Sequence, residues 1–148
     1  QGITNLRKQK KGFSLKSSTI QEVEDEIEKL SPDARRLLKG TLLTRNLAAE
    51  GETLFGSDVF DHARFGNLLI SQHEVLRDYL CISTPKIEQM IETALKAGAL
   101  GAKTTGSGGG GCIFAYACHK AESIAEALEK TGAKVYIVHV DDGVRKEN

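Results

Sequence analysis

The chain has 148 residues, of which 40% are apolar, and its 20 basic and 20 acidic side chains give a formal net charge of zero at pH 7. This length and composition suit a globular protein of one ordinary domain, or two small ones, with a true apolar core. The balanced charge argues against a dedicated nucleic-acid binder. No run of about 18 apolar residues offers a membrane span, so neither nucleic acid nor a membrane is expected as a partner.

The cysteines indicate that the protein belongs to a reducing compartment, the cytoplasm. There are three of them, which is too few and too odd a number for a disulfide framework. Their spacing pairs none of them with a nearby histidine in a zinc pattern, so no metal site is expected. Cys112 opens an apolar run and is expected to be a small buried filler.

The first 18 residues form a basic segment that we expect to be a tail or a frayed end. Residues 1–16 contain no acid, and the acids that follow at once cancel their charge. The basic residues are Arg7, Lys8, Lys10, Lys11 and Lys16. The chain opens on Gln1 rather than methionine, which suggests that further residues precede it. We expect residues 19–148 to form one domain.

Four helices are predicted next. Thr19 with Glu22 three residues later forms a capping box for a helix that ends near Leu30. Ser31 and Pro32 then open a second helix that runs to about residue 54. A third is expected over residues 58–80. The fourth begins at Pro85, after a cap at Ser83 or Thr84, and ends at Gly98.

The remaining pattern alternates strands and helices. We expect strands over residues 101–105 and 112–117, a helix over 121–131 and a last strand over 135–140. A glycine-rich loop joins the first two strands. The predicted fold class is therefore α+β, with a helical N-terminal half packed on a small antiparallel or mixed sheet that carries helices on one face.

The glycine-rich loop is the most informative motif. Between Thr105 and Cys112 it places Gly106, Ser107 and then four consecutive glycines. Ordering such a run is entropically costly, which is tolerable where bare backbone must approach another group. A P-loop is excluded because no Gly-Lys-Ser/Thr follows, and a dinucleotide fingerprint because the loop enters a strand. Phosphate contact and close packing of a glycine hairpin both remain open.

The stretch Gly98–Cys112 closely resembles the third, glycine-rich motif of the GHMP kinases, a superfamily named for galactokinase, homoserine kinase, mevalonate kinase and phosphomevalonate kinase. It departs from the mevalonate-kinase form of that motif at Thr104, usually aliphatic, and at Ser107, usually alanine. The resemblance extends over about residues 57–146. It implies the ferredoxin-like fold of the GHMP C-terminal domain.

The resemblance favours two members of the superfamily. Four uninterrupted glycines at 108–111 resemble mevalonate kinase, whereas galactokinases usually carry Phe or Trp where this chain has Gly109. His73 followed by Leu76-Arg77-Asp78 and then Ile82-Ser83 is similar to a galactokinase pattern. A mevalonate-kinase-like enzyme is the first expectation, and a galactokinase-like or other sugar kinase is the alternative.

The resemblance implies transfer of a phosphoryl group from ATP, with Mg²⁺, to a hydroxyl of a small metabolite, mevalonate or a sugar. The residues that it places near phosphate or substrate are Thr105, Gly106, Ser107, Gly108, Gly109, Gly110 and Gly111. The family's catalytic Asp and Lys and its main ATP-binding motif belong to an N-terminal domain that has no match in this chain. No catalytic residue is therefore expected here, and the missing N-terminal domain is an expected partner.

Two other arrangements stay open. The chain could be one half of a two-chain enzyme, or a free-standing domain that binds a metabolite or a partner without catalysis.

Among the histidines, His73 falls on the inward stripe of its helix, where a hydrogen-bonded core or cleft histidine is expected rather than a catalytic base. His62, His119 and His139 are expected to face solvent. Asp141-Asp142-Gly143 reads as a turn.

Overall fold

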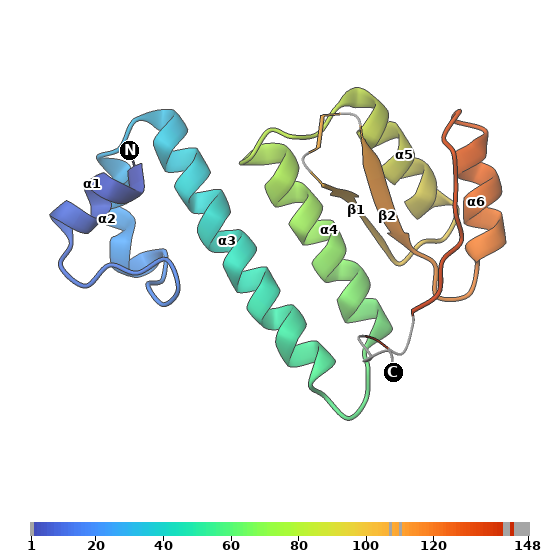
Figure 1. Cartoon of the computed structure of the whole chain (residues 1–148), viewed down its shortest axis with the longest axis horizontal. Coiled ribbons are helices and arrows are strands. Elements are labelled where there is room, and N and C mark those ends of the chain that lie inside the picture. Colours follow the sequence, from blue (N-terminus) through green and yellow to red (C-terminus); the bar gives the residue numbers. More distant parts are fainter. Residues whose placement is uncertain (1, 107, 110, 141–142, 144–148) are drawn as a thin grey trace, which may run out of the picture.

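The computed structural model describes residues 2–106, 108–109, 111–140 and 143 (Figure 1). The long helix α3 lies between the N-terminal helices and α4, and α4 separates α3 from the two strands (Figure 1). The elements in chain order are α1 (Gly2–Gln9), the 3₁₀ turn η1 (Gln21–Val23), α2 (Glu24–Glu28), α3 (Pro32–Phe55), α4 (His62–Asp78), α5 (Pro85–Lys96), β1 (Gly101–Thr105), β2 (Cys112–Tyr116) and α6 (Ala121–Glu129). The predicted α+β class is confirmed.

The N-terminal segment is folded rather than frayed. Residues 2–9 form α1, and Leu6 and Phe13 are buried. They pack with side chains from α2 and α3 in an apolar cluster of Leu6, Phe13, Val23, Ile27, Leu30, Leu38 and Leu42. The expectation of a solvated tail was wrong because two apolar side chains among many lysines are enough to dock the segment on this cluster.

The predicted capping box is present. The backbone N–H of Thr19 donates to Glu22 Oε2 at 2.9 Å, and that of Glu22 donates to Thr19 Oγ1 at 3.2 Å. The single helix expected from Thr19 to Leu30 is instead divided into η1 and α2, because the backbone of Val23 (φ −122°, ψ 12°) leaves helical geometry. Val23 and Ile27 are fully buried, so packing fixes both pieces.

The three long helices begin at side-chain caps. Ser31 Oγ accepts from the N–H of Ala34 at 3.4 Å and starts α3, with Pro32 in its first turn. Asp61 caps α4 by accepting from Arg64 N at 2.9 Å, so α4 begins four residues after the expected residue 58. Of the two candidates for α5, Thr84 is the cap.

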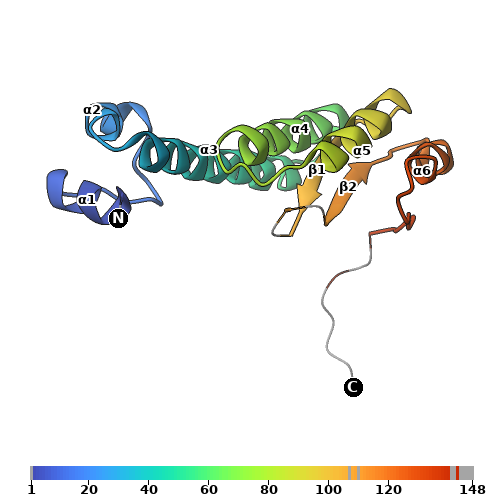
Figure 2. The same cartoon turned by 90° about the horizontal axis from the view of Figure 1, so that it is seen from above.

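The two strands form an antiparallel pair in which Gly101 lies opposite Tyr116 and Thr105 opposite Cys112. Helices α4 and α5 lie on the same side of this pair (Figure 2). Between helices and sheet lies a second apolar cluster of Ile87, Met90, Ile91, Ala94, Ala99, Ala102, Ile124 and Leu128. Helix α4 approaches β1 through two facing glycines, since a Cβ on Gly66 would lie 2.2 Å from the carbonyl oxygen of Leu100 and one on Gly101 would lie 2.1 Å from that of Gly66.

Two expectations for this half were wrong. Residues 135–140 form no strand, and Tyr136 and Val138 are 68% and 72% exposed. A strand needs a neighbouring strand for its backbone hydrogen bonds, and β-type side chains alone do not provide one. Cys112 is exposed, because β2 turns Ile113 and Ala115 toward the core and Cys112 to the other face. No helix among the described residues is both long enough and apolar enough to cross a membrane.

Candidate functional site

The glycine-rich loop joins β1 to β2 and is held in a backbone conformation that favours glycine. Gly106, Gly108 and Gly109 have φ values of +68°, +76° and +72°, in the left-handed region that costs other residues about 1–2 kcal/mol. Ser107 and Gly110, which belong to the predicted site, lie outside the described residues. The backbone conformation therefore favours glycine at these three positions of the loop.

One glycine of the loop packs against the turn between α4 and α5. A Cβ on Gly108 would lie 2.3 Å from the carbonyl oxygen of Ile82. The next residue, Gly109, donates its N–H to the same oxygen at 2.9 Å. This pair of contacts fixes the loop on Ile82, which the sequence did not indicate as a partner.

Two described glycines of the loop have open space beside them. A Cβ on Gly106 or Gly109 would meet no atom within 4 Å. No described backbone carbonyl accepts a hydrogen bond from the N–H of Gly106 or Gly108. Close packing, one of the two alternatives for this motif, thus occurs at Gly108, and the space beside Gly106 and Gly109 leaves phosphate contact as a prediction.

Threonines close the base of the loop. The hydroxyls of Thr104 and Thr105 each donate to the carbonyl oxygen of Cys112 at 3.4 Å. Thr104 is 1% exposed. Because its buried hydroxyl has a hydrogen-bond partner, it is accommodated where the resembling motif usually has an aliphatic residue.

Lys103 places a partly buried ammonium group beside the loop. It alternates with the inward-facing Ala102 and Thr104 and therefore lies on the opposite face of β1. Its Nζ donates to the carbonyl oxygen of Thr104 at 2.8 Å. Burial lowers the pKa of Lys103 from its ordinary value. Its position next to the glycine motif was the available sequence signal, and it was not singled out.

A polar network adjoins the turn between α4 and α5 on which the loop is held. His73 is 3% exposed, as expected for an inward histidine, and its Nε2 lies 3.0 Å from Glu88 Oε1. Ser83 Oγ donates to the same carboxylate oxygen, and Arg77 Nη1 lies 3.7 Å from Glu88 Oε2. Burial would raise the pKa of Glu88, but the hydrogen bond from Ser83 and the charge of His73 outweigh it and keep the pKa below its usual value.

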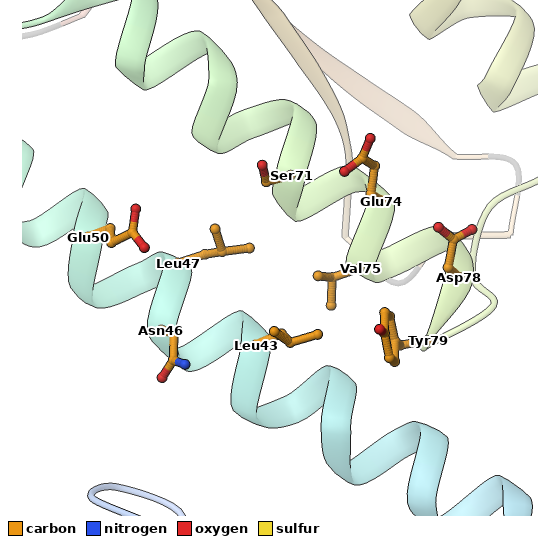
Figure 3. Close-up of a pocket in the computed structure, with 9 residues that line it drawn as sticks. All are labelled: Leu43, Asn46, Leu47, Glu50, Ser71, Glu74, Val75, Asp78 and Tyr79. Carbon is orange, nitrogen blue, oxygen red and sulfur yellow. The ribbon is translucent and has the colours of Figure 1, made fainter. Parts of the chain in front are cut away.

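A cavity of about 240 Å³ borders this network between α4 and α5, with His73, Arg77 and Glu88 in its wall and Ala102 of β1 beneath. A larger cavity of about 480 Å³ lies between α3 and α4. In Figure 3 the apolar side chains of Leu43, Leu47 and Val75 meet in it. Helix α4 stands between this larger cavity and the strands (Figure 1), and none of its lining residues belongs to the glycine loop.

The remaining titratable candidates lie on the surface. His62 is exposed as expected, but it begins α4, and its Nδ1 lies 2.5 Å from the hydroxyl of Tyr116. His119 and His139 are exposed as expected. Residues 141 and 142 of the predicted turn lie outside the described residues. Among the residues that the structure describes, no group of three or more His, Cys, Asp or Glu side chains is arranged to hold a metal ion.

Comparison with known proteins gives a family match over most of the chain. The model described as "GHMP kinases C terminal" matches residues 45–134. Mevalonate kinase of Thermococcus gammatolerans is 31% identical over 141 residues, which are 92% of this chain and 42% of that protein. Mevalonate kinase of Pyrococcus furiosus is 40% identical over 85 residues, or 57% of this chain and 25% of that protein.

A galactokinase also matches. The enzyme of Mycobacterium tuberculosis is 37% identical over 71 residues, covering 47% of this chain and 20% of that protein. The chain thus spans less than half the length of each of these relatives. The matched residues 45–134 include α4, α5, both strands, the glycine loop and α6.

Proposed function

We propose that this chain, which belongs to the GHMP kinases as their C-terminal domain, contributes the glycine-loop wall of the active site in an ATP-dependent small-molecule kinase. The observation that carries the proposal is the loop itself. It is fixed on Ile82 at Gly108 and Gly109, while Gly106 presents bare backbone. The open side of the loop at Gly106 and Gly109 leaves room for a ligand beside the backbone.

The described residues fit a phosphate group. Uncovered backbone N–H groups of glycine loops are suited to phosphate oxygens, and those of Gly106 and Gly108 have no acceptor among the described backbone carbonyls. The N–H of Gly109 already donates to the carbonyl of Ile82, so Gly109 leaves room for a ligand but offers it no free N–H donor. Lys103 places a positive charge at the base of the same loop.

When bound, ATP with its Mg²⁺ supplies the phosphoryl group that an acceptor hydroxyl receives. This domain would orient and bind through backbone donors, because positioning and electrostatic stabilisation provide most of the catalysis in such transfers. The acid–base and principal nucleotide-binding groups are proposed to come from the N-terminal domain.

Mevalonate is the first proposed acceptor. Two mevalonate kinases are 31% identical over 141 residues and 40% identical over 85 residues, and the glycine run at 108–111 lacks the aromatic residue usual in galactokinases. A hexose is the second candidate, supported by the galactokinase that is 37% identical over 71 residues. Both acceptors offer a hydroxyl to the same phosphoryl transfer, so the loop is proposed to act alike with either.

The test uses the complete gene product that contains this chain. Purified protein is incubated with ATP and Mg²⁺ and with mevalonate, galactose or no acceptor, and ADP formation is followed. We expect ADP formation that depends on mevalonate. Dependence on galactose alone would overturn the first acceptor and support the second. Failure of the complete protein to bind ATP or to form ADP with any alcohol would overturn the kinase proposal.

A further inference from the structure

The turn between α4 and α5 determines where the glycine loop sits. The carbonyl oxygen of Ile82 receives the N–H of Gly109 and closely contacts Gly108. Immediately before it, Cys81 has a φ of +53°, which is unfavourable for a residue with a side chain. Such a backbone conformation persists only where surrounding contacts impose it, so the turn requires support from outside.

Part of that support comes from Arg36, whose Nη1 bonds Cys81 Sγ at 3.0 Å and the carbonyl oxygen of Tyr79, and one carboxylate supports the turn just beyond Cys81. Glu88 Oε1 accepts from Ser83, the residue that follows Ile82, and lies 3.0 Å from Nε2 of the buried His73. Its second oxygen lies 3.7 Å from Arg77 Nη1. Glu88 therefore joins the turn (Ser83), α4 (His73 and Arg77) and α5, on which it lies. Hydrogen bonds to an ionised carboxylate are stronger than those between neutral groups.

We propose that Glu88 is a positioning residue that holds the glycine loop in place through Ser83 and the carbonyl of Ile82, an inference that rests on the function proposed above for the loop. The path is short. The carboxylate of Glu88 accepts from the hydroxyl of Ser83, and the peptide bond before Ser83 carries the carbonyl of Ile82, which accepts from the N–H of Gly109. Glu88 forms no hydrogen bond or ion pair with the described part of the loop, so its effect on the loop is transmitted through Ser83. His73 orients the carboxylate by bonding the oxygen that Ser83 uses.

A different role would give the same static picture. The network could simply join α4 to α5, in which case its loss would weaken the whole domain and affect the loop only as one part of it. The two roles differ in which part of the domain becomes less stable when the network is weakened. Positioning predicts a local change at Gly109, whereas a general fastening of the helices predicts a change throughout the core.

The experiment measures backbone amide hydrogen exchange in the complete gene product. Ser83→Ala removes only the link between carboxylate and turn, and Glu88→Gln removes the charge while keeping the shape. Ser83→Thr, which keeps the hydroxyl, is the conservative variant. Thr93→Ala is the matched control, because Thr93 also lies on α5 but its hydroxyl bonds only its own helix, at Gln89 O (2.7 Å).

We expect exchange at Gly109 to rise about tenfold in Ser83→Ala and Glu88→Gln, the effect of losing one charge-assisted hydrogen bond that supports a local structure. Exchange at Ala102, in the core of β1, should stay at the wild-type rate. Ser83→Thr and Thr93→Ala should match the wild type at both amides. Wild-type exchange at Gly109 in Ser83→Ala and Glu88→Gln, or equal acceleration at Gly109 and Ala102, would overturn the proposal.

Enzyme kinetics on the same proteins separate this inference from the proposed function. With kinase activity present, Ser83→Ala and Glu88→Gln should lower kcat more than they raise the KM for the acceptor. If the wild-type protein has no kinase activity but Gly109 responds as expected, the proposed function fails and the positioning of the loop stands. If activity is present and Gly109 does not respond, only the positioning role fails.

Discussion

Replacing Gly108 with alanine tests the contact that fixes the glycine loop. The new Cβ would lie 2.3 Å from the carbonyl oxygen of Ile82, which is backbone and cannot rotate away as a side chain would. Gly106→Ala is the matched control, because its φ of +68° is close to the +76° of Gly108 but its Cβ would meet no atom within 4 Å. Both variants carry the same left-handed strain, so their difference isolates the contact with Ile82.

The strain costs each variant about 1–2 kcal/mol. The overlap adds about 1–3 kcal/mol to Gly108→Ala, which corresponds to a further factor of about 5 to 150 in the population of the anchored loop. The loop can escape the overlap by leaving Ile82, at the loss of one backbone hydrogen bond worth about 0.5–1.5 kcal/mol. We therefore expect Gly108→Ala to release the loop from Ile82 with only a small loss of global stability.

The assay compares the thermal midpoint of the complete gene product carrying each variant and its kcat/KM for the proposed phosphoryl transfer. Gly108→Ala should lower kcat/KM at least fivefold more than Gly106→Ala, with midpoints that differ by only a few degrees. Equal kinetic losses in the two variants would refute the reasoning, because they would mean that contact with Ile82 has no bearing on the loop's function. A large fall in midpoint confined to Gly108→Ala would refute the expectation that the loop detaches locally.

Three further changes have definite expected outcomes. Gly66→Ala should reduce the free energy of unfolding by about 2 kcal/mol or more, because its Cβ would lie 2.2 Å from the backbone oxygen of Leu100; Gly51→Ala, with nothing within 4 Å, should instead stabilise α3 slightly in the same chemical denaturation series. Glu88 has a lowered pKa in the folded protein, so it contributes stability above its ordinary value of 4.5 that is lost as the pH falls through the folded value. The stability difference between wild type and Glu88→Gln should accordingly shrink from pH 6 to pH 3, and a constant difference would contradict this account. Gly109→Val in the complete gene product should lower kcat/KM with an unchanged circular dichroism spectrum, because a branched side chain would strain the backbone at a φ of +72° and fill the open side of the loop; wild-type kinetics would count against the role proposed for the loop.

Much of the local structure could be predicted because its causes lie within a few residues of one another. The capping box at Thr19 and Glu22 joins atoms three residues apart. The cap at Thr84, Pro85 in the first turn and the apolar positions of α5 likewise act within one helix. The glycine motif also identified the family, since its residue types and spacing are specific without knowledge of the neighbouring elements.

The tertiary structure alone decided the contacts between distant segments. Residues 135–140 have strand-like side chains but form no strand, because pairing depends on a neighbour and not on propensity. Leu6 is buried although its surroundings are basic, because α2 and α3 complete a cluster around it. The loop is held by Ile82, which lies 27 residues before Gly109 in the chain, and the turn around Ile82 is tied to a carboxylate on the next helix. Sequence spacing specifies which groups share one face of a helix or strand, whereas only the packing of α4, α5 and β1 brings His73, Glu88 and the glycine loop together.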